Sequence, residues 1–261
     1  MRFMEHTRNI HIEYRMVRVS IACLIYKSVR WLKFVYAQVQ KYTNLEDNEF
    51  YFVANDANES VLAYLKDNNI PHYIHTNTEE QRKEWYINNV YRAWNTAGRM
   101  ARGEYVVFIN SDMAFTPNWL DKLIASKTEN TFVASRLVER GILRSGTYGI
   151  ERNFGDTPET YQEGAFVEYA RQIGKPELHS SGLYMPILIN KAHLEAINYY
   201  PEGNIRPDSD IFNPVYAKLG EPCIPGDVVF TRRLETKGIH HVTNFDSIVY
   251  HFQQGEMMDT V

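Results

Sequence analysis

The sequence predicts an α/β protein: a mainly parallel sheet with helices on both faces, formed as a single domain that carries an insertion. Short apolar runs of strand length alternate with segments whose apolar residues recur at helical spacing. Such alternation requires crossover connections, which make the strands parallel and place helices over the two faces of the sheet. In addition, polar residues directly follow three of the strand-like runs, which bears on function.

The strand-like runs are short and nearly continuously apolar, as is typical of strands buried on both faces. They span residues 19–26, 49–54, 71–74, 105–109, 184–189 and 247–251. Ser28 can cap a helix, because apolar residues follow it at helical spacing. Further helices are expected at 60–66, 79–102, 191–197 and 226–237, with another that opens at 116–120.

Two segments do not follow this alternation. Residues 135–181 are rich in Gly, Glu, Arg and Tyr and lack clean periodicity. We interpret them as the insertion, partly loops, that covers the site or shapes it for an acceptor. Residues 1–17 are interpreted as a polar lead-in, since they lack the apolar core and the cleavage site of a signal peptide.

The composition excludes several classes of protein. A chain of 261 residues with a net charge of -4 has no positive excess for neutralising nucleic acid phosphates. Two cysteines form neither a disulfide framework nor a zinc motif. No apolar run has the length of a transmembrane helix. A cytoplasmic location is the simplest inference, and a peripheral contact with a membrane is left open.

Polar residues at three strand ends indicate where chemistry takes place. They are Tyr26 and Lys27 after the first strand, Asn55 and Asp56 after the second, and Asn110, Ser111 and Asp112 after the run at 105–109. Ligands of parallel α/β sheets bind beyond the carboxyl ends of the strands. These polar side chains are therefore expected to lie along one edge of the sheet.

The same residues resemble a known family. The opening strand to Lys27, the runs 93–95 and 101–105, and Asn110-Ser111-Asp112 at the place of an Asp-x-Asp motif occur in the order of the GT-A glycosyltransferases of family 2. Asp227, with Arg233 and Gly238 six and eleven residues later, is similar to the family's catalytic helix, and His251 to the histidine that follows it. The resemblance covers residues 18–251.

The resemblance implies a GT-A type, Rossmann-like domain at 18–261. Its part 18–125 would bind the donor nucleotide, and 135–261 would hold the acceptor and the catalytic residue. The implied activity is inverting transfer of a sugar from a nucleotide-sugar, with a UDP-sugar as first choice, to a hydroxyl of a glycan or another acceptor. Guanosine and thymidine donors stay open.

A divalent cation is expected, because the departing diphosphate gathers negative charge that a metal ion stabilises. Hard cations prefer oxygen ligands, so Asp112 is the first candidate ligand. His251 would add an imidazole nitrogen, which makes Mn²⁺ as suitable as Mg²⁺. Asn110 replaces the family's usual acid and keeps only a neutral acceptor oxygen. The alternative is that Asp112 merely begins a turn before Pro117.

The other candidate residues have one chemical role each. Asp227 would be the general base that takes the proton of the acceptor hydroxyl, or only a helix N-cap. Asp56 or Asn55 would accept the N3–H of a uracil base, or form an Asx-turn. Tyr26 would stack on the base or pack in the core. The resemblance adds Asn95, Ser111 and Arg233 to the donor-binding set, with Arg233 suited to a diphosphate.

Three other functions compete with this one. A sugar-1-phosphate nucleotidyltransferase needs a glycine-rich loop after the first strand, and no glycine follows Tyr26 there. A non-catalytic nucleotide or sugar-binding module stays open, because Asn110 and Gly226 each stand where the family usually has an acid. A processive polymerase is disfavoured, since its Gln-x-x-Arg-Trp motif is absent.

Overall fold

The computed structural model describes residues 17–205, 215–216 and 222–259. The predicted lead-in, 1–17, lies outside these residues except for Val17. The strands are β1 (Val19–Ile25), β2 (Asn48–Asn55), β3 (His72–His75), β4 (Tyr105–Ile109), β5 (Met113–Ala114), β6 (Thr131–Glu139), β7 (Ile150–Glu151), β8 (Leu178–Ser180), β9 (Ile187–Asn190), β10 (Val215–Tyr216), β11 (Pro222–Cys223) and β12 (His240–His251). The helices are α1 (Val29–Tyr42), α2 (Glu59–Asp67), α3 (Glu79–Lys83), α4 (Ile87–Met100), α5 (Trp119–Ser126), α6 (Glu163–Ile173), α7 (Lys191–Ala196), α8 (Gly226–Glu235) and α9 (Gly255–Met258).

The main sheet has the order β3-β2-β1-β4-β9-β6-β12-β5. Strands β1 to β4 are mutually parallel, whereas β9 runs antiparallel to both β4 and β6. Two reversals restore the direction, so β6 and β12 run the same way as β4. The predicted mainly parallel α/β fold is confirmed. The ends of β1, β2, β4, β6 and β12 therefore form one edge, here called the carboxyl edge.

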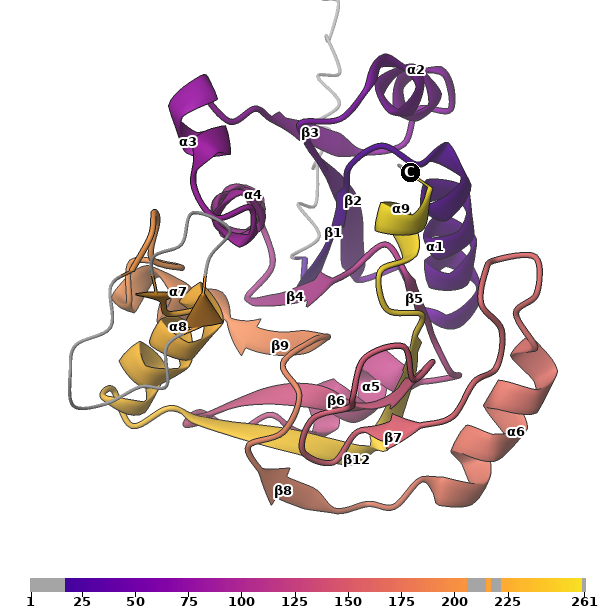
Figure 1. Cartoon of the computed structure of the whole chain (residues 1–261). Coiled ribbons are helices and arrows are strands. Elements are labelled where there is room, and N and C mark those ends of the chain that lie inside the picture. The colour runs from indigo at the N-terminus through magenta and orange to yellow at the C-terminus, as the bar shows by residue number, and fades with distance from the viewer. Residues whose placement is uncertain (1–16, 206–214, 217–221, 260–261) are drawn as a thin grey trace, which may run out of the picture.

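Helices cover both faces of this sheet, as predicted (Figure 1). One core joins β1 and β2 to apolar residues of α1, α2 and α5. The other packs α4, α7 and α8 against the opposite face. A third cluster, which includes Trp31, Phe166 and Tyr250, seats α6 against β12. Because α4 leads into β4 and α8 leads into β12, both helices begin at the carboxyl edge and end at the amino edge.

Local signals explain the first helix and its strand. Ser28 caps α1 as predicted, because its hydroxyl accepts a hydrogen bond from the Trp31 N–H at 3.3 Å. At the opposite end of β1, Gly103 lies so close that a Cβ on it would be 2.7 Å from the Ser20 backbone nitrogen. The Ser20 hydroxyl accepts the Gly103 N–H at 2.7 Å, so β4 enters the sheet tight against β1.

Three predicted elements need correction. The helix expected at 79–102 is two helices, because Glu84 is extended and ends α3, and α4 begins at Ile87. Residues 135–181, expected to be an insertion made partly of loops, also contain the second half of β6 up to Glu139 and the helix α6, which the pattern does not predict. The last strand begins at His240 rather than 247.

The two missed strand portions share one cause. Polar residues interrupt the apolar pattern where β6 and β12 shift register between Asn244 and Ile248. The Asn244 carboxamide accepts the backbone N–H groups of Asp246 and Ser247 at 2.7 and 2.9 Å. The buried hydroxyls of Ser135 and Ser247 bond to each other at 2.8 Å. The polar residues that interrupt the apolar pattern of these strands are thus the ones that stabilise the register shift.

In the part of the chain that the structure describes, no helix is long and apolar enough to cross a membrane.

We expect His241→Phe to reduce the loss of stability in acid. The buried His241 ring stacks on Phe132, with centroids 4.7 Å apart, and burial lowers its pKa to about 4. The unfolded chain takes up this proton near pH 6.5. The stability that depends on His241 is therefore full above pH 6.5 and falls with pH, by about 2.5 kcal/mol at pH 4.5. Urea unfolding at pH 7.0 and pH 4.5 measures the difference.

The exposed neighbour provides the control. His240→Phe should leave the acid sensitivity as it is in the wild type. Equal acid sensitivity of His241→Phe and the wild type would contradict a neutral, buried His241.

Candidate active site

A short strand pairing brings the central polar residues together. After β4, the chain turns through Asn110–Asp112 and forms β5, which pairs antiparallel with the end of β12. In this register Met113 lies opposite His251. Asp112, next to Met113, is thereby placed beside His251, although β9 and β6 separate β4 from β12 in the sheet. The two predicted metal ligands therefore meet at the carboxyl edge.

His251 lies between two carboxylates. Its Nε2 is 3.4 Å from Oδ1 of Asp112, and its Nδ1 is 3.0 Å from Oε1 of Glu139 at the end of β6. Glu139 also accepts a short hydrogen bond from the Ser145 hydroxyl. The second oxygen of Asp112 accepts the Gly255 N–H at 3.0 Å. This geometry fixes the ring so that Nε2 faces Asp112, the arrangement that carboxylates impose on metal-binding histidines.

The charges of this triad stabilise one another. Burial alone would lower the pKa of His251, but Asp112 and Glu139 raise it to about 10. Burial would likewise raise the pKa of Asp112, yet His251 and the Gly255 N–H hold it below its usual range. The imidazolium thus supplies the positive charge that the buried carboxylates require.

The chemistry of this donor set fits a divalent cation. Among the described residues, no three His, Cys, Asp or Glu side chains are grouped to hold a metal ion. Asp112 and His251 nevertheless present one oxygen and one nitrogen that face each other 3.4 Å apart. When two ligand atoms are each about 2.1 Å from one cation and their bonds to it form a right angle, the two atoms are roughly 3 Å apart. A bound cation would take the place of the Nε2 proton.

The remaining residues of the turn border this pair. Asn110 is partly exposed at the end of β4. The Ser111 hydroxyl donates to Glu256 of α9 at 3.0 Å. Tyr26, at the end of β1, is 38% exposed, which excludes a core role for its ring. The Lys27 ammonium lies 4.4 Å from the centre of that ring.

Asp56, at the end of β2, is fully engaged by hydrogen-bond donors. It has a positive φ of 47°, and its carboxylate accepts the backbone N–H and the side-chain amide of Asn77 at 3.0 and 2.8 Å. Arg82 adds two bonds at 2.6 and 3.3 Å. Burial would raise the pKa of Asp56, but Arg82 and Asn77 lower it. Asn55 accepts the Asn77 amide at 3.0 Å and joins the same cluster.

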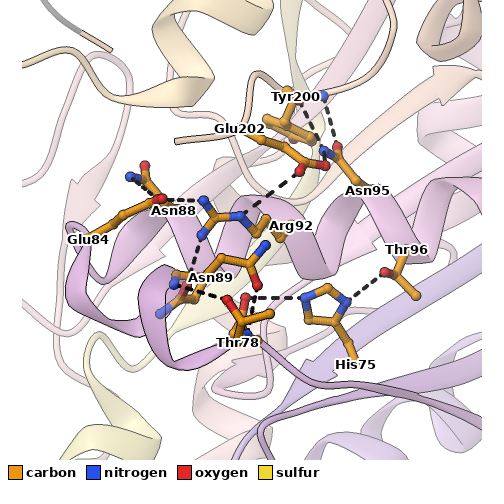
Figure 2. A network of polar contacts seen from close by, with 12 residues as sticks. His75, Thr78, Glu84, Asn88, Asn89, Arg92, Asn95, Thr96, Tyr200 and Glu202 are labelled. Atoms are coloured by element: carbon orange, nitrogen blue, oxygen red, sulfur yellow. Dashed lines mark hydrogen bonds and ion pairs between the residues drawn. The ribbon is translucent and has the colours of Figure 1, made fainter. Parts of the chain in front are cut away.

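Asn95 belongs to a polar network inside the protein (Figure 2). Its carboxamide donates to the Tyr200 carbonyl at 3.0 Å and accepts the Tyr200 N–H at 2.9 Å. It also donates to Glu202 at 2.9 Å. The buried Arg92 stands beside it, bonded to Glu84 and to Asn89. These bonds use the Asn95 amide to hold the segment around Tyr200 against α4.

Arg233 lies away from Asp112. It follows Asp227 by six residues on α8, which displaces it by about 9 Å toward the amino edge. There it donates to the Ile197 carbonyl at 3.4 Å. It lines a cavity of about 690 Å³ together with Arg99, Tyr200 and Glu202. The structure does not bring Arg233 together with the carboxyl-edge residues.

Asp227 begins α8 at the carboxyl edge. Burial raises its pKa above the usual range, while the Val228 N–H and the Tyr91 hydroxyl, both hydrogen-bonded to it, act in the opposite direction. Tyr91 lies near the start of α4, which also begins at this edge. A Cβ on Gly226 would be 2.6 Å from the Tyr91 ring. Tyr91 therefore fills the space that an acidic side chain before Asp227 would need.

Sequence reasoning missed four residues of this edge: Glu139, Tyr91, Arg82 and Glu256. Glu139 would have been found if β6 had been predicted, because it ends a strand like the other candidates. Tyr91 and Arg82 lie on helices, where polar and aromatic residues are common and signal little. Glu256 reaches the site only through the turn after β12.

Comparisons with known proteins agree with this architecture. Residues 56–183 match the family described as glycosyl transferase family 2. This match ends before Asp227 and His251. No curated protein matches the chain.

Three solved structures have the same fold. Their TM-scores are 0.55 for GalNAc-T7 with UDP, GalNAc and Mn²⁺, 0.57 for S. aureus TarS 1-349, and 0.53 for the mannosyltransferase PcManGT from Pyrobaculum calidifontis with GDP-Man and Mn²⁺. Each is 14% identical to this chain and covers 92, 90 and 90% of it, respectively. The chain spans 44, 60 and 56% of their lengths.

The fold is thus the α/β fold of GT-A glycosyltransferases, as the strand order and the carboxyl-edge site indicate. Residues 56–183, just under half of the chain, are similar to a glycosyl transferase family 2 domain. The resemblance stated from the sequence is confirmed.

We expect Asp112→Asn to weaken Mn²⁺ binding at least about ten-fold, because it removes the only charged oxygen that faces His251 Nε2 among the described residues. Glu139→Gln should weaken it by a similar factor, since the ring of His251 loses its charged partner at Nδ1. Electron paramagnetic resonance of free Mn²⁺ measures both affinities.

Asp121→Asn, an exposed position on α5, changes the same charge away from this pair and serves as the control. Unchanged Mn²⁺ affinity in Asp112→Asn would disprove the metal role of this residue.

Proposed function

We propose that the protein transfers a sugar from a nucleotide-sugar to an acceptor hydroxyl with inversion of the anomeric carbon. The observation that carries this proposal is the meeting of Asp112 with His251 at the edge where Asp227 begins α8. The family 2 match and the GT-A fold support it. The solved neighbours were seen with UDP, with GDP-Man and with Mn²⁺, which supports a nucleotide-sugar donor and a divalent cation.

Asp227 would act as the general base. The acceptor oxygen loses its proton to the Asp227 carboxylate as it forms a bond to the anomeric carbon, and the bond from that carbon to the diphosphate oxygen breaks. A base works best when its pKa approaches the working pH. Burial moves the pKa of Asp227 in this direction. One base on the face opposite the leaving group accounts for inversion.

Asp112 and His251 would hold the cation, with Glu139 keeping the His251 ring in place. The bound cation would neutralise the charge that develops on the diphosphate. Asn110 leaves this site with one carboxylate fewer than the family's usual pattern, so we propose a weak metal site that is completed by the donor's phosphates.

Uracil is the first choice for the nucleobase of the donor. Asp56 offers a carboxylate to a uracil N3–H, and the exposed Tyr26 ring offers a stacking surface. Both oxygens of Asp56 already have two donors each, so the base must replace a bond to Arg82 or Asn77. Arg82, whose side chain is about half exposed, is the partner that can move. We propose that the acceptor is bound by residues 135–207.

A non-catalytic nucleotide-sugar-binding module is the second candidate. The packing of Tyr91 against Gly226 favours it, because this packing leaves no space for the acid that family members usually carry before the catalytic aspartate. Both candidates predict nucleotide binding. Only the first predicts turnover that depends on Asp227.

A nucleotide panel with one variant separates them. We expect one of UDP, GDP, dTDP and CDP to raise the melting temperature in the presence of Mn²⁺, because a ligand that binds only the folded state stabilises it. Hydrolysis of the matching nucleotide-sugar should fall at least about 100-fold in Asp227→Asn, since the general base is lost. Nucleotide affinity should stay the same.

Asp67→Asn, at the exposed end of α2, is the matched control. Binding without turnover in the wild type would favour the binding module. The donor-site assignment fails if no nucleotide stabilises the folded protein.

Tyr91→Phe tests the base through the pH profile. The Tyr91 hydroxyl lowers the pKa of Asp227, so its removal should raise that pKa further. Because the base must be deprotonated, activity is lost as the pH falls through this pKa. The acid limb of kcat/KM should therefore move to higher pH in the variant. If the acid limb of kcat/KM does not move in Tyr91→Phe, another group determines its pKa. Tyr36→Phe, on α1, is the control.

A further inference from the structure

Three consecutive backbone N–H groups at the end of β1 bind one carboxylate of the same chain. Tyr26, Lys27 and Ser28 donate to Glu256 at 3.1, 3.3 and 3.0 Å. They form the concave set of donors that precedes the first turn of α1, an arrangement that suits anions. Glu256 lies on α9, more than two hundred residues later in the chain, so the contact is purely tertiary.

The same carboxylate also reaches β4. Its second oxygen accepts the Ser111 hydroxyl at 3.0 Å, next to the Asp112 that faces His251. Glu256 thereby connects the ends of β1 and β4, which is where ligands of parallel α/β sheets bind. Any nucleotide that approaches these strand ends would compete with Glu256 for the same donors.

The segment 253–259, here called the strap, is attached at several points. The Gly255 N–H bonds to Asp112, and a Cβ on Gly255 would be 2.5 Å from that of Asp112. Asp259 accepts the Ser28 hydroxyl at 2.5 Å and Arg30 at 2.9 Å. In Figure 1, α9 accordingly lies beside the start of α1.

The other end of the strap is anchored in the protein. The buried Gln253 accepts the backbone N–H groups of Gly141, Ile142 and Leu143 at 3.1, 2.9 and 3.1 Å. Gln253 and Gln254 both have positive φ, near 58°, which turns the chain back over the edge. Only the part after Gln254 is held by the charged contacts of Glu256 and Asp259.

We propose that the strap is an autoinhibitory element, in which Glu256 occupies the backbone donors at the end of β1 and leaves when the donor nucleotide binds. This inference rests on the proposed function, since it assigns regulation to the same donor site. Burial raises the pKa of Glu256 to about 7, so its charged form is held there against a desolvation cost. A ligand that replaces this carboxylate therefore displaces a contact of small net stability.

The test compares UDP binding to the wild type and to Glu256→Gln in the presence of Mn²⁺, with GDP in parallel. The variant keeps the size of the side chain but removes its charge and replaces one of its two acceptor oxygens by an NH₂ group, so the contacts with the backbone N–H groups and Ser111 become weaker. The open state, in which the strap has left the end of β1, becomes more populated in the variant. The apparent Kd for UDP falls by the factor by which this population rises, expected to be at least about five-fold. Glu168→Gln, exposed on α6, is the matched control.

Asp259→Asn provides a second variant that leaves the β1 donors and Glu256 intact. It weakens only the hold on Ser28 and Arg30, so it should tighten UDP binding in the same direction by a smaller factor. Hydrogen exchange of the peptide that spans 253–259 gives an independent readout. UDP with Mn²⁺ should speed exchange in this peptide of the wild type.

The outcomes are distinct. Tighter binding in both variants together with faster exchange of the strap supports autoinhibition. Equal or weaker UDP binding in Glu256→Gln, or slower exchange on UDP addition, would overturn it and make the strap a part of the bound site. If none of UDP, GDP, dTDP and CDP binds the wild type or either variant, the proposed function itself fails.

Discussion

The pairing of Met113 with His251, where β5 meets the end of β12, determines how the polar edge of this protein is built. Without that pairing, the turn after β4 would end two strands away from β12. With it, Asp112 lies against His251, and Glu139 closes the other side of the ring. The turn after β12 then places Gly255 against Asp112 and Glu256 beside Ser111. Both the Asp112–His251 pair and the strap depend on this one antiparallel contact.

The groups suited to a donor are already paired within the protein. Asp112 is paired with His251, Asp56 with Arg82 and Asn77, and the donors at the end of β1 with Glu256. Buried or partly buried charges need such partners, because an unpaired charge in a low-dielectric site is costly. A ligand that binds these groups would therefore exchange partners with them, and its net binding free energy would be the difference between two sets of good contacts. Arg82, whose side chain is about half exposed, is the partner that can exchange most readily.

Packing between α4 and α8 accounts for a departure from the family pattern. Tyr91 fills the space beside Gly226 and also bonds to Asp227, so one aromatic residue both occupies the place of an acid and adjusts the remaining carboxylate. The direction of α8 separates Asp227 at the carboxyl edge from Arg233 near its other end. Asp227 and Arg233, which look like parts of one motif in the sequence, therefore lie in different surroundings.

The sequence by itself determined the α/β class, the strands β1, β2, β4 and the helices that cover them, because continuous apolar runs and helical spacing depend only on local residues. It also singled out Asp112, His251 and Asp227 as candidates, since each lies at or close to the end of an element that the pattern predicts. The tertiary structure alone decided that β6 extends to Glu139, because the polar residues Ser135 and Asn244 that interrupt the pattern are satisfied only across a register shift between two strands. It also decided which polar residues have partners. Asn95 forms hydrogen bonds with Tyr200, and Glu256 forms hydrogen bonds with the end of β1. These bonds join residues more than one hundred positions apart, so no local sequence pattern indicates them.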